Sequence, residues 1–132
     1  MTELDMWNIL AAFMTGNAIW FLGYVVATWL GFRMTNNMYT SGEGNIVAKI
    51  LVSGYCLSVS AFMCVLMVNT NGLLRDVATG LTNIGESGAL SGAAQAFVAE
   101  ASNMPDMNPI QMVFIASIIV MQLLQVWMKK PS

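Results

Sequence analysis

Residues 7–32 read WNILAAFMTGNAIWFLGYVVATWLGF and contain no aspartate, glutamate, lysine or arginine. A helix that crosses the hydrocarbon core of a bilayer needs about 17 to 25 predominantly apolar residues. This stretch meets that length with residues to spare, which leaves room for the helix to tilt. It predicts a first membrane-spanning helix and decides the class of fold for the chain.

Two further stretches meet the same length criterion. They are residues 46–68, IVAKILVSGYCLSVSAFMCVLMV, and residues 109–128, PIQMVFIASIIVMQLLQVWM. Lys49 lies one turn inside the second stretch, where its flexible stem lets the ammonium group reach the interface. We expect an all-α integral membrane protein with three transmembrane helices, forming a single membrane domain over residues 1–132.

The composition of the whole chain agrees with this class. Hydrophobic residues make up 57% and charged residues 9%, whereas soluble domains carry about 25% charged residues. The acidic N-terminus MTELD and the length of the first apolar stretch are atypical of a signal peptide, so we expect that helix to be retained. The small net charge of −2 and the lack of a basic patch argue against nucleic acid as a partner.

Charged residues predict the orientation. Three spans place the N-terminus and residues 69–108 on one side, and residues 33–45 and the C-terminus on the other. The second side carries Arg33, Lys49, Lys129 and Lys130 against Glu43, and the first carries Arg75 against Glu3, Asp5, Asp76, Glu86, Glu100 and Asp106. The positive-inside rule then predicts a cytoplasmic C-terminus in a bacterial inner membrane, with the aromatic rings of Trp7, Tyr39 and Trp127 near the interfaces.

Residues 69–108 are expected to form a long, partly helical extracytoplasmic loop between the second and third helices. NTNG at 69–72 is typical of a turn, with at most a brief helix at 73–77, and the Gly- and Ser-rich residues that follow favour irregular chain. GAAQAFVAEA at 92–101 predicts a short helix with Phe97 and Val98 on one side. A membrane surface or a partner is a candidate location for this helix, and because the loop has few large apolar residues, we expect something outside the loop to order it.

Two helix faces carry small residues. In the first span they are Ala12, Gly16, Gly23, Ala27 and Gly31, which fall on one stripe about 100° wide, with Asn17 beside it. In the second span they are Ser53, Cys56, Ser60 and Cys64, at spacings of 3, 4 and 4 residues. Such faces let helix backbones approach closely, so they predict packing within the chain or against another subunit. A pore lining is the alternative interpretation, and Asn17 needs a hydrogen-bond partner in either case.

Other polar residues of the spans have modest interpretations. Cys56 and Cys64 would lie about 12 Å apart along an intact helix, and a disulfide needs Cα atoms within about 7 Å, so no intrachain bond is expected. Three glutamines in the third span predict hydrogen bonds between helices or, alternatively, contacts to a quinone: Gln111, Gln122 and Gln125.

Catalytic patterns are missing from the sequence. The chain has no histidine, which removes the commonest general base and most zinc sites. It also lacks HExxH, CxxC, P-loop and dinucleotide-binding motifs, and no carboxylate lies inside a span, as ion-coupled transport would require. We therefore expect no enzyme acting alone and no cofactor held within the chain.

NMPDMNP at residues 103–109 has two interpretations. Asn108 is a good N-cap and Pro109 a good first helical residue, so the stretch predicts the start of the third span. Thioethers also suit Cu(I), and a carboxylate beside them could tune such a site. Met104, Asp106 and Met107 are therefore candidate copper ligands.

The features together favour a non-catalytic accessory subunit of a larger membrane complex. Its partners would be other integral membrane subunits and lipids, in one or several copies, and an energy-converting or oxidoreductase complex is the expected host. One alternative is a homo-oligomeric channel or small transporter with Asn17, Ser53 and Ser60 along its pathway. A second alternative is a copper-handling membrane protein that uses the outer loop.

Overall fold

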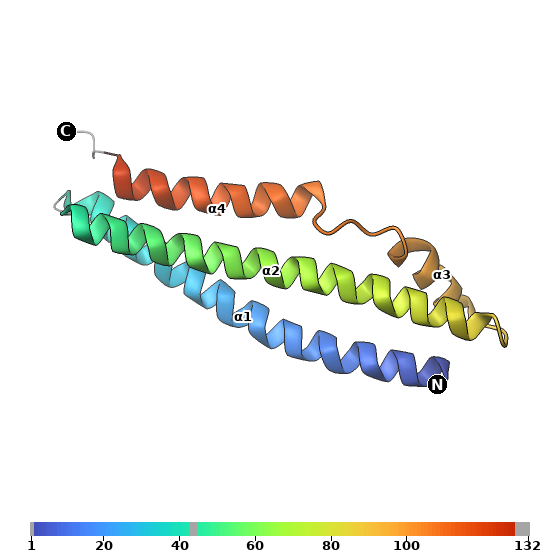
Figure 1. The fold of residues 1–132 in the computed structure, drawn as a ribbon. Coiled ribbons are helices and arrows are strands. Elements are labelled where there is room, and N and C mark those ends of the chain that lie inside the picture. Colours follow the sequence, from blue (N-terminus) through green and yellow to red (C-terminus); the bar gives the residue numbers. More distant parts are fainter. Residues whose placement is uncertain (1, 43–44, 129–132) are drawn as a thin grey trace. The chain divides into compact units, whose positions relative to one another are not determined.

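The structure, a computed structural model, describes residues 2–42 and 45–128. The helices are α1 (Glu3–Ser41), α2 (Ile46–Gly85), α3 (Gly92–Ala101) and α4 (Pro109–Trp127) (Figure 1). No residue in the described ranges is in a strand. Helices α1, α2 and α4 are long and apolar enough to cross a membrane, as the sequence predicts.

The helices begin at residues with clear capping chemistry. The Thr2 hydroxyl accepts a hydrogen bond from the Asp5 amide, and the Asp5 carboxylate accepts one from the Thr2 amide, which is a reciprocal cap for α1. The Asn45 side-chain oxygen accepts from the Ala48 amide at 2.7 Å and starts α2 at the predicted residue. Gly42 follows the end of α1 with a φ of +68°, a conformation that favours glycine.

The predicted boundaries hold for α3 and for the starts of α2 and α4, but the predicted ends of the first and second helices are wrong. Helix α1 runs from Glu3 to Ser41 instead of over residues 7–32, so residues 33–41 of the predicted connection 33–45 are helical. Helix α2 continues through NTNG at 69–72 to Gly85, so irregular chain is confined to the segments that flank α3. Two features explain the difference. The Thr70 and Thr82 hydroxyls donate to carbonyls of the preceding turn, so these polar side chains are accommodated within the helix. Val77 and Leu81, four residues apart, are buried on one face. Burial along one helical face outweighs the turn preference of a few residues.

The contacts divide the chain into two compact units, which are described separately here. Unit 1 comprises Met1–Trp20 and Leu66–Asn108, and unit 2 comprises Phe21–Val65 and Pro109–Ser132. Helices α1 and α2 contribute residues to both units, α3 belongs to unit 1, and α4 belongs to unit 2.

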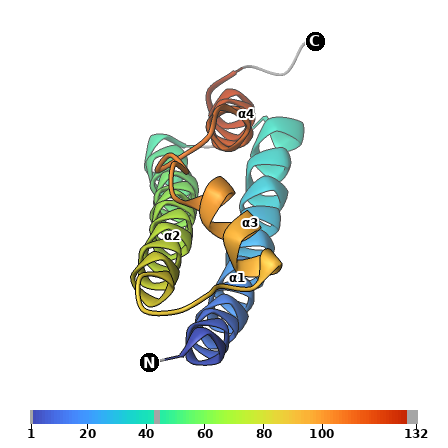
Figure 2. The same ribbon diagram turned by 90° about the vertical axis from the view of Figure 1, so that its right-hand side faces the viewer.

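Unit 1 has an apolar core. Helix α3 packs between the first turns of α1 and the last turns of α2 (Figure 2). The buried cluster consists of Met6, Val77, Leu81 and Ala94, and the partly buried side chains around it are Trp7, Leu10, Leu73, Ile84, Leu90, Phe97 and Val98. The rings of Trp7 and Phe97 meet edge to face at 5.4 Å, so Trp7 belongs to this core, whereas the sequence suggests an interfacial anchor.

The segment after residue 69 packs against another part of the same chain, the N-terminal turns of α1. Its own apolar residues are few, but the N-terminal turns of α1 complete the core. Glu3 on α1 also accepts hydrogen bonds from the hydroxyl and amide of Ser91, the N-cap of α3. No local sequence pattern indicates this contact, because Glu3 and Ser91 are 88 positions apart along the chain.

Unit 2 is a three-helix arrangement of α1, α2 and α4 segments. Helix α4 has 19 residues, about 28 Å at 1.5 Å per residue, and this length matches a hydrocarbon core of about 30 Å. Large apolar side chains lie on the outside, among them Ile50 and Leu51 on α2 and Val113 on α4. The interior, in contrast, contains several polar side chains.

Candidate functional site

Gln122 of α4 lies at the centre of the polar interior of unit 2. Its side chain is 1% exposed, and its Nε2 donates to the backbone carbonyl of Thr28 on α1 at 3.3 Å. The Thr28 hydroxyl in turn donates to the sulfur of Met63 on α2 at 3.4 Å. Thr28 therefore links all three helices of the unit.

Gly31 creates the space for Gln122. A Cβ at Gly31 would lie 2.8 Å from Gln122 Nε2 and 3.3 Å from the Cys56 sulfur. Real Cβ atoms do not approach heavy atoms so closely without a shift of the neighbour. The glycine thus allows α4 and α2 to approach α1, as expected for a small residue at a membrane-helix interface.

Three further polar contacts tie the helices of unit 2 together. The Thr35 hydroxyl donates to Gln125 Oε1 at 2.6 Å. The Trp127 indole N–H donates to the Ser53 hydroxyl at 2.9 Å, and the Tyr55 hydroxyl donates to the Ala27 carbonyl at 3.0 Å. Hydrogen bonds between helices, predicted for the glutamines of the third span, are confirmed for Gln122 and Gln125.

Two buried acceptors of unit 2 have no hydrogen-bond partner among the described residues. They are Ser60 Oγ and Gln122 Oε1. Both side chains are 1% exposed, so a group as large as a quinone headgroup has no access to them in this conformation. The quinone interpretation of Gln122 finds no support in this geometry.

The small-residue face of α2 lies inside the chain. Ser53, Cys56 and Ser60 are buried, and Cys64 is half-buried. Cys56 and Cys64 are both free thiols, as the spacing predicts. This face packs against other helices of the same chain.

The exposure of the small-residue stripe on α1 changes along the helix. Gly31 is buried and Ala27 is half-buried, whereas Ala12, Gly16 and Gly23 are exposed. Apart from the adjoining backbone of α1 itself, no described atom lies within 4 Å of a Cβ built at Gly16 or Gly23. The chain therefore uses one end of the predicted stripe and leaves the rest uncovered.

Asn17, beside this stripe, has the partner that its position requires. Its Nδ2 donates to the Thr70 hydroxyl of α2 at 3.1 Å, and that hydroxyl donates to the Leu66 carbonyl at 2.8 Å. This contact belongs to unit 1.

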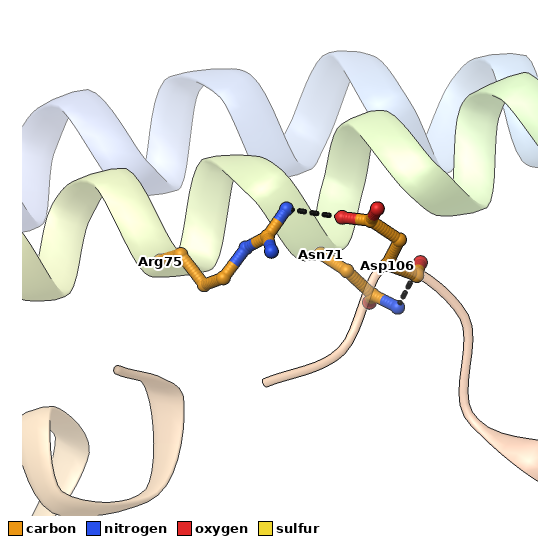
Figure 3. Close-up of polar contacts among 3 residues, drawn as sticks. All are labelled: Asn71, Arg75 and Asp106. Carbon is orange, nitrogen blue, oxygen red and sulfur yellow. Dashed lines mark hydrogen bonds and ion pairs between the residues drawn. The ribbon is translucent and has the colours of Figure 1, made fainter. Parts of the chain in front are cut away.

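The candidate copper ligands lie between α3 and α4, and the carboxylate among them is already paired. The Arg75 guanidinium contacts Asp106 Oδ1 at 2.5 Å, and Asn71 Nδ2 donates to the Asp106 backbone carbonyl at 2.9 Å (Figure 3). Met104 and Met107 are half-buried. A cation at Asp106 would therefore have to compete with Arg75. Among the described residues, no group of three or more His, Cys, Asp or Glu side chains could hold a metal.

Comparisons of the chain with protein-family models, with curated proteins and with solved structures found no match.

Thr28 and Thr35 are the residues that sequence reasoning missed. They lie three residues before and four residues after Gly31, so all three share one helix face. That spacing could have extended the small-residue stripe to Thr35. The signal was overlooked because threonine is larger and more polar than the residues that define such stripes.

Proposed function

We propose that the chain is a non-catalytic accessory subunit of a larger integral membrane complex, inserted through α1, α2 and α4. The observation that supports this most strongly is the uncovered glycine stripe of α1. Apart from the adjoining backbone of α1, Gly16 and Gly23 have no described atom within 4 Å of a built Cβ, although small residues at this spacing are typical of close helix packing in membranes. A helix of another subunit would cover this face.

The exposed apolar surface also supports a lipid or protein environment. In the most apolar 18-residue segment of α1, no residue is buried. In the corresponding segments of α2 and α4, 22% of the residues are buried. The positive-inside rule then orients the chain in a bacterial inner membrane. The N-terminus and α3 lie on the extracytoplasmic side, and the C-terminus lies on the cytoplasmic side. Other membrane subunits, lipids or further copies of the chain are the partners in this proposal.

The two alternative functions receive less support from the geometry. A channel lined by Asn17, Ser53 and Ser60 would need side chains that face a pathway, but Ser53 is bonded to Trp127, and Ser60 is buried. Copper binding at Met104, Asp106 and Met107 would need release of the Asp106 carboxylate from Arg75.

Gentle detergent extraction followed by native mass measurement tests the proposal. We expect wild-type chain in a complex with other membrane subunits, and we expect Gly16→Leu/Gly23→Leu to release it as an intact, helical chain. Gly54→Leu is the matched control, because Gly54 also has no described atom, apart from the adjoining helix backbone, within 4 Å of a built Cβ but lies on α2 outside the stripe. Wild-type chain that is isolated without any partner would refute the proposal.

A further inference from the structure

A groove on unit 2 runs between α1 and α2. It has a volume of about 520 Å³, within the range of about 300–1,000 Å³ that small-molecule sites occupy. Its walls are formed by Leu30, Arg33, Met34, Asn37, Leu51, Val52 and Tyr55. Arg33 and Asn37 are the only strongly polar side chains of this lining.

Arg33 has the features of an anion-binding side chain. It is exposed, and its guanidinium lies over the Trp29 ring, 5.6 Å from the centroid. In the described part of the chain, the one ion pair joins Arg75 to Asp106, so no described carboxylate neutralises Arg33. A guanidinium presents several N–H donors that suit phosphate oxygens.

The polar end of the groove lies level with the end of α4. Thr35, between Arg33 and Asn37, donates to Gln125, and α4 ends two residues later at Trp127. Because α4 matches the thickness of the hydrocarbon core, this level corresponds to a membrane–water interface. Trp29 and Trp127 lie at the same end, where aromatic rings are enriched at interfaces.

We propose that this groove binds an anionic phospholipid, with an acyl chain along Leu30, Leu51 and Val52 and the phosphate at Arg33 and Asn37. Charge complementarity selects the occupant. The lipids of the cytoplasmic leaflet are partly anionic, and the only charged group of the lining is a cation. This inference rests on the proposed membrane insertion but does not depend on any protein partner.

Native mass spectrometry of the purified full-length chain with equal amounts of phosphatidylglycerol and phosphatidylcholine of the same acyl chains tests this site. We expect preferential retention of one phosphatidylglycerol. Arg33→Gln should lower that preference roughly fivefold, the effect of one basic residue near an anionic lipid surface, and Arg33→Lys should keep most of it. Leu51→Trp, which fills the groove, should reduce retention of both lipids, whereas Leu57→Trp outside the groove should not.

Lys49→Gln is the matched charge control, because Lys49 is a cation of the same unit that lies over Trp127 and outside the groove lining. Equal loss of preference in Lys49→Gln and Arg33→Gln would overturn the proposal in favour of general charge attraction. Equal wild-type retention of the two lipids, or displacement by soluble glycerol phosphate, would also overturn it. Membrane insertion is checked separately by carbonate extraction of membranes, and the accessory role by co-purification, so each idea fails on its own measurement.

Discussion

In unit 1 the buried cluster is apolar, formed by Met6, Val77, Leu81 and Ala94. Across the whole of Leu66–Asn108, no large hydrophobic side chain is exposed. Most of the exposed large hydrophobic side chains of the chain belong to unit 2. Its interior is mixed: apolar side chains such as Met63, Ile115 and Ile118 are buried together with polar ones, namely Thr28, Thr35, Ser53, Ser60 and Gln122.

The two regions differ in which side chains they expose. In Leu66–Asn108 the large hydrophobic side chains are turned inward, the arrangement that removal of apolar area from water favours. Unit 2 exposes large apolar side chains and joins its helices through small residues and hydrogen bonds, an arrangement compatible with a lipid environment. The same helices, α1 and α2, thus follow different packing rules along their length.

The largest effect is expected in the apolar core of unit 1. Leu81 is 0% exposed, so Leu81→Ala should lower the stability of unit 1 by about 2–5 kcal/mol through lost burial and an unfilled cavity. Hydrogen exchange of the α3 amides should accelerate, while exchange in α4 stays unchanged. Leu4→Ala, at a side chain that is 66% exposed, is the control. Similar exchange rates in the two variants would contradict an apolar core in unit 1.

A smaller loss is expected from crowding the interior of unit 2. Gly31→Ala places a Cβ against Gln122 and Cys56 and should destabilise unit 2 by about 1–3 kcal/mol, a usual cost of overpacking. Denaturant unfolding in detergent micelles measures the change. Gly54→Ala is the control, because it raises helix propensity as much as Gly31→Ala does, but its Cβ meets no atom of another helix. If both variants gained stability alike, the close approach of the helices at Gly31 would be wrong.

A still smaller effect is expected when the central amide is removed. Gln122→Leu loses one bond to the Thr28 carbonyl and also an unpartnered buried oxygen. The change should stay within about 1 kcal/mol, because hydrogen bonds between membrane helices contribute little on average. The same unfolding assay tests this, with Gln122→Ala as a cavity-forming comparison that should cost more. A loss of several kcal/mol in Gln122→Leu would mean that Gln122 holds a further group.

The smallest effect is a pH dependence confined to unit 1. The pKa of Glu3, which precedes the expected span, lies below its usual value of 4.5 because the carboxylate accepts hydrogen bonds from the Ser91 hydroxyl and amide and from the Trp7 indole. A carboxylate with a lowered pKa stabilises the fold above the unfolded-state pKa, and the contribution is lost as the pH falls through the folded-state value.

Docking of α3 should therefore weaken as the pH falls below about 4.5, the usual glutamate range. Trp7 fluorescence between pH 6 and 3 reports this, and Glu3→Gln should flatten part of the response. Part of the pH dependence should remain in this variant, because hydrogen bonds from Thr2 also lower the pKa of Asp5. An identical pH profile in Glu3→Gln would show that the Glu3–Ser91 contact does not hold α3.

Much of the fold follows from the sequence alone. Three apolar stretches predict three long helices, Asn108 and Pro109 mark the start of α4, and residues 92–101 predict α3. These features are local, since the length of an apolar run and the chemistry of a cap depend on neighbouring residues only. The spacing of the small residues also predicts the two small-residue faces.

Only the tertiary structure decided how those faces are used. Gly31 meets Gln122, while Gly16 and Gly23 of the same stripe meet nothing. Helix α2 continues to Gly85 because Val77 and Leu81 are buried against α1 and α3. Hydropathy and spacing identify a face that is suited to packing. Which part of that face is covered depends on where distant segments approach it, and no local pattern records that approach.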